Sequence, residues 1–386
     1  MRSSHPARLG FTLLLPLLLA AGCGPSGGGA AAPRTRTYYV AADEVVWDYT
    51  PSGKNGITNA AWNEVQRPIV EAGALHVGHL ARKAIYREYT DSTFTTLKPR
   101  PPEWEHLGIL GPLLRAVVGD TIRVVFKNQA SFPASMHPHG VFYLKDSEGA
   151  PYADGTSGGD MEDDGVAPGA THIYLWPVPE RAGPAHGEGS TAFWMYHSHT
   201  NEVDDVNAGL IGPIIVTARE FARADATPTD VDRELIVGFL EFDETNSTLW
   251  ETNLRTYGKP PKVIKPDLAF GERTVGPESQ YAFKESVNGF LYGNGGGLTM
   301  HVGDRVRWYL MALTNFEIHS PHWHGNTVVA GHMRTDVAAL LPMGMLVADM
   351  VPDNPGTWLF HCHVAPHLLM GMEATYDVLP RNGAGR

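Results

Sequence analysis

Cysteine, long apolar runs and positive charge are all scarce in this chain of 386 residues. Only Cys23 and Cys362 are present, which excludes a fold held together by several disulfides. After residue 22 no apolar run reaches the roughly 18 residues that a membrane-spanning helix needs. The formal net charge of -12 argues against a nucleic-acid partner, because a phosphate backbone attracts basic surfaces.

The N-terminal segment predicts export. Arg2 and Arg8 precede an apolar run over residues 11–21, which is the charge order of a secretory signal. The small residues before Cys23 resemble a bacterial lipoprotein signal, so we expect residues 1–22 to be removed, Cys23 to be lipidated and residues 23–34 to form a flexible tether. The chain would then be held at the periplasmic or extracellular face of the cell envelope by lipid alone. A plain cleavable signal is the alternative.

The rest of the sequence predicts an all-β protein with an internal repeat. Short runs rich in β-branched and aromatic residues alternate with glycine and proline. A Val-Gly-Asp triplet ending at Asp120 precedes an HPHG motif ending at Gly140, and a second triplet ending at Asp304 precedes an HWHG motif ending at Gly325. The two spacings from Asp to Gly are nearly equal, at 20 and 21 residues. We therefore expect two related sandwiches, residues 35–218 and 233–381, with a linker over residues 219–232.

Ten of the 18 histidines gather in four short clusters, two in each repeat. They are His137 and His139; His197 and His199; His319, His322 and His324; and His361, His363 and His367. Clustered imidazoles indicate a metal site, yet they suit copper, zinc, iron and nickel alike. The histidines alone therefore leave the metal open.

Cys362 narrows the choice of metal. It lies between His361 and His363 on a predicted strand, so the thiolate faces one side and both imidazoles the other. His319, His367 and Met372 add two imidazoles and a distant thioether, a ligand set typical of a blue-copper electron-transfer site. The other eight clustered histidines suit a larger metal cluster. The short covalent path from Cys362 to His361 and His363 would carry electrons between the two sites, which gives these three residues the catalytic role.

With these motifs the chain resembles the multicopper oxidases, in particular their ceruloplasmin-like branch. The resemblance extends over nearly the whole chain after the signal, and it implies two cupredoxin-like Greek-key β-sandwich domains with four coppers per chain. It assigns His319, Cys362, His367 and Met372 to a type-1 copper; His137 and His322 to a type-2 copper; and His139, His197, His199, His324, His361 and His363 to a type-3 pair. It also implies that a reducing substrate gives electrons to the type-1 copper, while the other three coppers reduce dioxygen to water.

The first repeat lacks a type-1 site, because Ala134 aligns with His319 and Ser198 with Cys362. Both repeats supply ligands to the three-copper cluster, which must therefore lie between domains. The resemblance implies that these domains belong to different copies of the chain, in a homotrimer with cyclic head-to-tail contacts. A monomer with an internal cluster is the competing prediction.

The sequence favours small phenols and aromatic amines as electron donors, as in two-domain laccases. Glu317 could bind ferrous ion, but ceruloplasmin-like ferroxidases carry an acidic residue directly before the second type-1 histidine, where this chain has Pro366. Oxidation of ferrous or cuprous ion is the alternative, the latter because methionines gather between Met333 and Met370, where core packing explains them better. A copper nitrite reductase and a non-enzymatic relative are less favoured, since the full set of copper ligands is present.

Two acidic segments carry weaker predictions. Lys145, Glu148, Asp154, Asp160, Asp163 and Asp164 resemble the calcium-binding loop of coagulation-factor A domains, although a solvated acidic loop is equally compatible. Glu202, Asp204 and Asp205 follow His199 and could relay protons to the cluster. Helix capping or solvation explains these three carboxylates better.

Overall fold

The computed structural model describes residues 32–260, 279–313 and 317–381. Ala32–Arg386 forms one compact unit. The predicted signal and the lipidation site at Cys23 lie outside the described residues. Within the described ranges, every helix is too short or too polar to cross a membrane.

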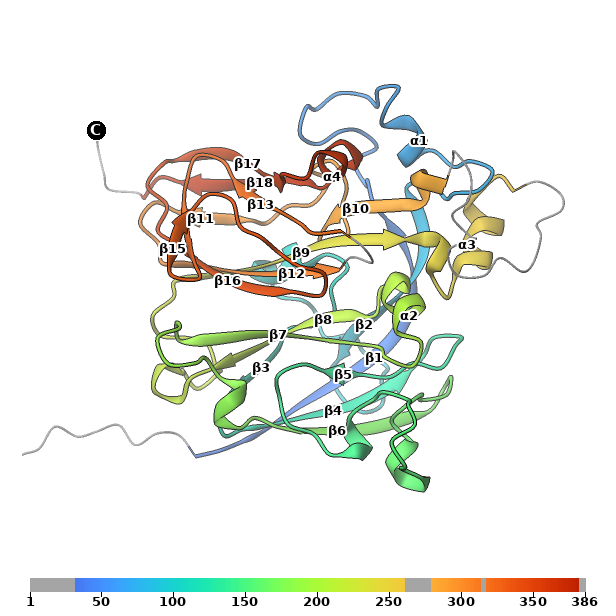
Figure 1. The fold of residues 1–386 in the computed structure, drawn as a ribbon, viewed down its shortest axis with the longest axis vertical. Coiled ribbons are helices and arrows are strands. Elements are labelled where there is room, and N and C mark those ends of the chain that lie inside the picture. The colour runs from blue at the N-terminus through green and yellow to red at the C-terminus, as the bar shows by residue number, and fades with distance from the viewer. Residues whose placement is uncertain (1–31, 261–278, 314–316, 382–386) are drawn as a thin grey trace, which may run out of the picture. The chain divides into compact units, whose positions relative to one another are not determined.

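Two four-stranded sheets form the first sandwich (Figure 1). One sheet has the order β2-β1-β4-β6 and the other the order β3-β8-β7-β5. Their strands are β1 (Thr35–Asp48), β2 (Leu80–Tyr89), β3 (Leu114–Val117), β4 (Thr121–Asn128), β5 (His137–Pro138), β6 (Thr171–Pro177), β7 (Thr191–His197) and β8 (Ile211–Thr217). Side chains alternate along β7: Trp194 and Tyr196 face the core of this sandwich, whereas Phe193 and Met195 face away from it.

A six-stranded sheet, β10-β9-β12-β16-β14-β15, and a four-stranded sheet, β11-β18-β17-β13, form the second sandwich. Their strands are β9 (Arg233–Asp243), β10 (Phe283–Val287), β11 (Thr299–His301), β12 (Val306–Leu313), β13 (Pro321–Trp323), β14 (Val328–Ala330), β15 (Met333–Thr335), β16 (Met345–Met350), β17 (Gly356–Cys362) and β18 (Glu373–Leu379). In β17, Trp358, Phe360 and Cys362 face the core between these sheets, so His361 faces outward. The all-β prediction is confirmed.

The helices are short and lie in the connections between strands. They are α1 (Arg67–Val70), α2 (Glu202–Ala208), α3 (Trp250–Tyr257) and α4 (Ala365–Met370), with 3-10 turns η1 (Pro102–Leu107), η2 (Lys145–Ser147), η3 (Gly158–Met161), η4 (Glu180–Ala182), η5 (Arg219–Phe221), η6 (Glu244–Asn246) and η7 (Ser279–Ala282). α2 and α4 each follow a histidine motif and end at a glycine with positive φ, Gly209 at 119° and Gly371 at 112°. The internal repeat therefore extends to the turns that return the chain from these motifs.

A third apolar core joins the two sandwiches. Phe193 and Ile215 of the first sandwich pack with Ile236 and Tyr309 of the second, and the rings of Phe193 and Tyr309 are 5.3 Å apart. The sheet that holds β7 and the sheet that holds β9 and β12 are therefore the inner layers (Figure 1). The sheet of β13 and β17 lies beyond them as an outer layer. This core unites both sandwiches in one compact unit, so the structure does not divide them at a particular residue. The predicted domain boundaries at residues 218 and 233 stay predictions.

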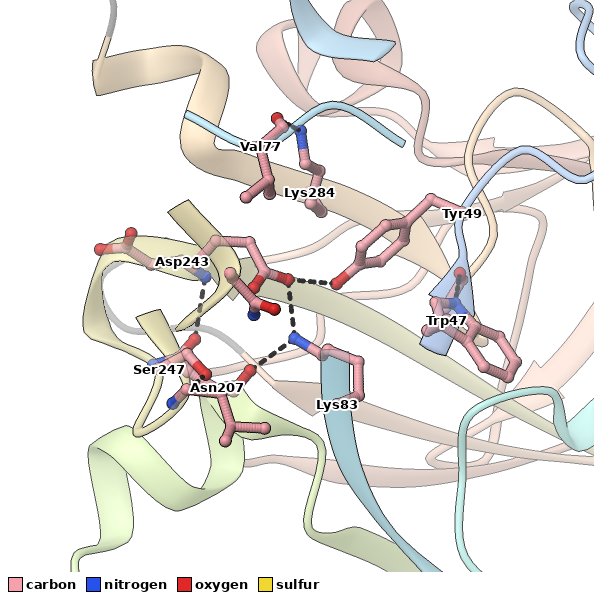
Figure 2. A network of polar contacts seen from close by, with 12 residues as sticks. Trp47, Tyr49, Val77, Lys83, Asn207, Asp243, Ser247 and Lys284 are labelled. Carbon is pink, nitrogen blue, oxygen red and sulfur yellow. Dashed lines mark hydrogen bonds and ion pairs between the residues drawn. The ribbon is translucent and has the colours of Figure 1, made fainter. Parts of the chain in front are cut away.

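A buried network of charges crosses the same junction (Figure 2). Glu244 Oε1 accepts hydrogen bonds from Tyr49 at 2.5 Å and from Lys83 Nζ at 2.7 Å. Lys83 Nζ also donates to the carbonyl of Asn207 at 2.6 Å. Lys284 Nζ donates to carbonyl oxygens, among them that of Val77 at 3.2 Å. Fully buried charges persist only with such partners, so the network fixes how the two sandwiches meet.

Candidate metal centres

The first candidate centre surrounds Cys362, at the end of β17. Its sulfur lies 3.4 Å from Nδ1 of His367, which α4 carries, and 3.8 Å from Nδ1 of His319, which is bridged to Leu340. Cys362, His319 and His367 are all buried, and burial raises the pKa of the thiol. A thiol in this setting stays protonated unless a cation replaces the proton.

The imidazoles of His319 and His367 lie close enough together to bind one metal ion. Their Nδ1 atoms are 3.1 Å apart, and burial lowers the pKa of His319 to about 4, so its ring is neutral near pH 7. Met372 is buried in the same core as Cys362, and its carbonyl accepts from the backbone N–H of Cys362 at 3.1 Å. The structure thus brings together the thiolate and both imidazoles predicted from the sequence, with the predicted methionine beside them.

The second candidate centre is a quartet at the ends of β5 and β7, which we call the first quartet: His137, His139, His197 and His199. His137 and His197 are register partners across the two strands. The Nε2 atoms of His139 and His197 are 3.1 Å apart, and the rings of His137 and His199 are 5.1 Å apart. Burial lowers the pKa of His139 to about 4 and that of His197 to about 3. Neutral imidazoles packed this closely suit a cation between them.

The third candidate centre repeats this geometry on β13 and β17, and we call it the second quartet: His322, His324, His361 and His363. His322 and His361 are register partners, and the Nε2 atoms of His324 and His361 are 3.1 Å apart. Ligand atoms of His322, His324 and His361 lie within 4.8 Å of one another. His363 is exposed, and its ring is 5.2 Å from that of His322. This quartet is therefore open to solvent on the outer face of its sheet.

Hydrogen bonds to carbonyl oxygens orient the rings of both quartets. Nδ1 of His137 contacts the carbonyl of Glu148 at 2.7 Å, and Nδ1 of His361 contacts that of Cys362 at 2.8 Å. His197 and His322 make the same contact to Ser198 and Asp336 at 3.0 and 2.9 Å. A carbonyl only accepts, so Nδ1 carries the proton and Nε2 keeps a free electron pair. This arrangement fixes metal-ligating histidines, so the donor set fits the predicted copper ions.

The two quartets do not meet within one chain. All ring contacts among these eight histidines lie within one quartet or the other. The six-stranded sheet separates the layer that holds β5 and β7 from the layer that holds β13 and β17. Moreover, the second quartet points away from the core of its own sandwich. The two quartets are therefore separate in the described chain, and the predicted assembly of the cluster between copies stays a prediction.

Sequence reasoning missed a pair of carboxylates beside His367. Glu241 of β9 and Glu285 of β10 are register partners, both are buried, and each has a ligand atom within 4.8 Å of one on His367. Burial, then the charge of Glu241, raises the pKa of Glu285 well above its usual range. Glu317, which the sequence did single out, contacts His367 Nε2 at 2.9 Å. No local motif marks the pair, because 44 residues separate its members and only the β9–β10 pairing brings them together.

The acidic loop of the first sandwich has an internal cation. Lys145 Nζ lies 2.6 Å from Glu148 and 2.8 Å from Asp154, and it also contacts the hydroxyl of Tyr152. Asp163 instead accepts from the backbone of Gly149 at 2.6 Å. Calcium in this loop stays a prediction, and the ammonium group of Lys145 already balances two of the proposed ligands.

The acidic residues after His199 separate in the structure. Glu202 contacts His199 Nε2 at 3.1 Å, whereas Asp205 is buried and accepts from the hydroxyl of Ser198 at 2.7 Å. Asp204 accepts from the side chain of Asn201 at 3.2 Å. These contacts agree with local structural roles, and a proton relay stays a prediction.

Comparison with known proteins decides the family. Models of the family described as "Multicopper oxidase" match residues 107–220 and 272–382, which hold both quartets and the centre around Cys362. The chain belongs to the multicopper oxidase family. Membership in this family confirms the predicted copper cofactor and makes the chain an oxidoreductase.

Curated relatives of this multicopper oxidase are much longer proteins. The chain is 41% identical to Ferroxidase HEPHL1 of Homo sapiens over 349 residues, covering 89% of this chain and 29% of that protein. It is 39% identical to Hephaestin and 38% identical to Ceruloplasmin, both of Homo sapiens, and covers 29% and 31% of them. The chain thus spans less than a third of the length of these relatives.

Solved structures share the fold at low identity. A crystal structure of a multicopper oxidase matches with a TM-score of 0.52 at 18% identity, covering 89% of this chain and 88% of that chain. A copper nitrite reductase from Nitrosomonas europaea matches with a TM-score of 0.56 at 15% identity, covering 89% and 94%. At these identities the likeness supports the cupredoxin-like sandwich fold and nothing about the reaction.

Proposed function

We propose that this multicopper oxidase oxidises ferrous ion and reduces dioxygen to water, with four ferrous ions oxidised for each dioxygen. Copper, when bound, supplies the one-electron chemistry. His319, Cys362, His367 and Met372 would hold the type-1 copper; His137 and His322 the type-2 copper; and His139, His197, His199, His324, His361 and His363 the type-3 pair. The observation that carries the choice of substrate is the buried carboxylate pair of Glu241 and Glu285 beside His367.

The carboxylate pair has the chemistry of a cation site. Glu241 and Glu285 lie directly opposite each other on adjacent strands, where like charges repel. Glu285 Oε2 is buried and has no hydrogen-bond partner among the described residues. A divalent cation bound there would relieve both costs, and hard carboxylate oxygens suit ferrous ion better than a phenol.

The position of the pair suits electron transfer. The His367 ring turns Nδ1 towards Cys362 and Nε2 towards Glu317, so one imidazole separates the carboxylates from the sulfur. The chain then leads directly from Cys362 to His361 and His363 of the second quartet. Glu241 and Glu285 would hold the substrate, and His367 and Cys362 would connect it to the oxygen-reducing cluster.

One comparison and one feature of the structure support ferrous ion over the predicted phenols. The relative with 41% identity is named a ferroxidase. The argument against iron rested on Pro366, which stands where such enzymes carry an acid; here Glu241, Glu285 and Glu317 bring carboxylates to His367 from other parts of the chain. The relatives therefore favour the metallo-oxidase alternative over the laccase-like prediction.

Cuprous ion is a weaker candidate, because the methionines contribute to packing. Met350 is buried in the second core, and Met343, Met345 and Met370 pack against the third. Met333 is exposed on β15. A thioether site for a soft cation would need several of these sulfurs to converge, so their dispersal over two cores supports the choice of ferrous ion.

Substitution of Glu285 by Gln tests the substrate site. Loss of one charged ligand should lower kcat/KM for ferrous ion by about tenfold to a hundredfold, while a phenol such as 2,6-dimethoxyphenol should be oxidised at the parental rate. Oxygen uptake with each donor measures both. The control is Glu251→Gln, an exposed carboxylate on α3. Equal losses for both donors, or no loss for ferrous ion, would contradict the proposal.

We also propose that three chains form a cyclic trimer in which the first quartet of one copy meets the second quartet of the next. Large apolar side chains are exposed after both HxHG motifs: Phe142 and Leu144 on the first sandwich, Val329 and Met333 on the second. Leu144 is 65% and Met333 67% exposed. Exposed apolar side chains near both quartets are compatible with surfaces that a partner covers. Contact between two different surfaces closes into a ring when the rotation fits.

Complementation between two inactive variants tests this assembly. His139→Ala damages the first quartet and His363→Ala the second, so each variant alone should be inactive. Co-expressed chains would assemble intact clusters from the undamaged halves at about a quarter of the interfaces. Oxygen uptake should therefore return to roughly that fraction of the parental rate, and sedimentation should give a trimer. An absence of rescue in a verified mixed trimer, or an active monomer, would contradict the arrangement.

Export and lipidation at Cys23 complete the proposal. The charge order before the apolar run at residues 11–21 supports export, and the small residues before Cys23 support a lipid anchor. Mass spectrometry of the mature N-terminus distinguishes a lipoprotein from a protein with a plain cleavable signal, because only lipidation adds acyl chains to Cys23.

A further inference from the structure

A cavity of about 810 Å³ lies on the first sandwich, away from all the histidine ligands. It opens between β2, represented by Ile85 and Arg87, and the segment around η1, residues 97–113. Asp225 and Thr227, from the connection between the sandwiches, complete its wall. None of the predicted copper ligands lines this cavity, so the proposed oxidase chemistry does not account for it.

The wall of the cavity is mostly apolar. Its lining includes Trp104, Leu107, Pro112 and Leu113. The guanidinium of Arg115 lies 5.3 Å from the centre of the Trp104 ring, which fixes one face of the indole against a cation. Small-molecule sites have this composition, with apolar walls and a few polar groups that set orientation. The cavity has room for a ligand of two fused rings.

Four of the eight charged side chains that line the cavity, Arg87, Glu88, Lys98 and Arg115, are in ion pairs. Lys98 Nζ lies 2.8 Å from Glu88, and Arg115 Nη2 lies 2.6 Å from Glu234. Glu103 and Glu105 are exposed, so water solvates their charges. These groups leave the cavity with no strong preference for either sign of charge.

Arg100 is the one lining cation that has no ion pair among the described residues. Its guanidinium donates to the carbonyls of Gly108 and Leu110 at 2.9 and 2.8 Å, and among the described residues no carboxylate lies within 4 Å of it. Burial is the largest cause that lowers the pKa of Arg100, yet a guanidinium stays charged at any ordinary pH. A half-buried cation held in place by two carbonyls and lacking an anion attracts one.

We propose that this cavity binds a small planar organic anion, an aromatic or conjugated carboxylate, with its charge at Arg100 and its rings against the apolar wall. A neutral ligand would leave the cation uncompensated, and a cationic ligand would be repelled by it. A free inorganic anion would gain nothing from Trp104 and the leucines. The combination of fixed cation and apolar wall therefore selects an amphipathic anion.

Binding here would stabilise the junction of the two sandwiches. The segment that forms the cavity wall reaches the second sandwich, because Nη1 of Arg233 donates to the carbonyl of Glu103 at 3.1 Å and His106 accepts from the backbone of Ile236 at 3.1 Å. A ligand that binds only the folded chain raises its stability in proportion to the logarithm of ligand concentration. The cavity thus links a small metabolite to the stability of the oxidase.

Titration calorimetry of the copper-loaded protein tests the proposal with 2-naphthoate as the probe. We expect one naphthoate per chain and at least about tenfold tighter binding than for 2-naphthamide, its uncharged analogue. Arg100→Gln should remove this difference between the two probes. The control is Arg255→Gln, an exposed arginine on α3 whose loss should change neither affinity.

A second variant covers the possibility that Arg100→Gln disturbs the fold, since Arg100 tethers two carbonyls. Leu97→Glu places a negative charge on the exposed rim of the cavity, so it should weaken naphthoate more than naphthamide. Absence of naphthoate binding, equal affinities for both probes, or an unchanged preference in folded Arg100→Gln would overturn the proposal. Because ferrous oxidation is not the readout, failure here leaves the proposed function untouched.

Discussion

The two sandwiches place their histidine quartets alike, but the residue between the last two histidines of each quartet differs. His137 pairs with His197 in the first sandwich as His322 pairs with His361 in the second. Even the glycines that follow are equivalent: a Cβ on Gly140 would lie 2.2 Å from the Trp194 ring, and one on Gly325 would lie 2.3 Å from the Trp358 ring. Both glycines have positive φ, so the HxHG motif needs glycine for conformation and for space.

The differing position is Ser198 in the first sandwich and Cys362 in the second. Cys362 meets two imidazoles, whereas the hydroxyl of Ser198 donates to the buried carboxylate of Asp205 at 2.7 Å and accepts from the backbone of Ser135 at 3.1 Å. The strand fixes where this side chain points, and Ala134 in place of His319 removes a second ligand from the same region of the first sandwich. One scaffold can therefore keep the cluster ligands and drop the electron-accepting site.

Substitution of Cys362 by Ser should have the largest effect on activity. Cys362→Ser removes the thiolate, so oxygen uptake with any donor should fall by at least about a hundredfold, more than the loss caused by outer-shell changes at metal sites. The other three coppers should stay bound, as measured by metal analysis. The matched control is Ser198→Ala, which should keep the oxidase rate and lose about 1–3 kcal/mol of stability through the lost hydrogen bonds of the Ser198 hydroxyl to Asp205 and Ser135. Full activity in Cys362→Ser would refute the role of the thiolate.

The second test removes the buried ion pair between Lys83 and Glu244 at the junction of the sandwiches. Lys83→Met leaves Glu244 buried without its cation, which should lower the free energy of unfolding by about 3–5 kcal/mol. Its neighbour Arg82 provides the control, because it pairs with Glu44 at 3.1 Å while 45% exposed, and Arg82→Met should cost at most about 1 kcal/mol. Denaturant unfolding of both variants measures the difference. Similar losses would mean that the buried network does not stabilise the junction.

The sequence predicted those parts of the site that share a strand or a short motif. Alternation around Cys362 gave the opposite directions of sulfur and imidazoles, and the repeat of the HxHG motif gave two equivalent quartets. The sandwich fold followed from short strands between glycine and proline. In each case the information lies within about ten residues, where local geometry is set by the period of a strand.

The rest depended on contacts between distant segments. Glu241 and Glu285 form a pair only because β9 and β10 are adjacent. The third core, formed by residues such as Phe193 and Tyr309, was also invisible, because inward and outward faces of a buried strand are both apolar. Pairing between strands far apart in the chain has no short-range signal.

The smallest expected effect concerns Asp205, whose buried carboxylate accepts a hydrogen bond from the Ser198 hydroxyl. Burial raises the pKa of Asp205 to about 6, above the roughly 3.9 of an unfolded aspartate. The folded chain therefore binds the proton more tightly, so this group stabilises the fold at low pH and that contribution is lost as the pH rises from about 4 to above 6. Asn at this position cannot titrate. From pH 4 to pH 7, the stability of Asp205→Asn relative to the parent should thus rise by about 2 kcal/mol, as measured by denaturant unfolding at matched copper loading. A constant difference across this range would mean that the pKa of Asp205 is the same in the folded and the unfolded chain, and would contradict the effect of burial.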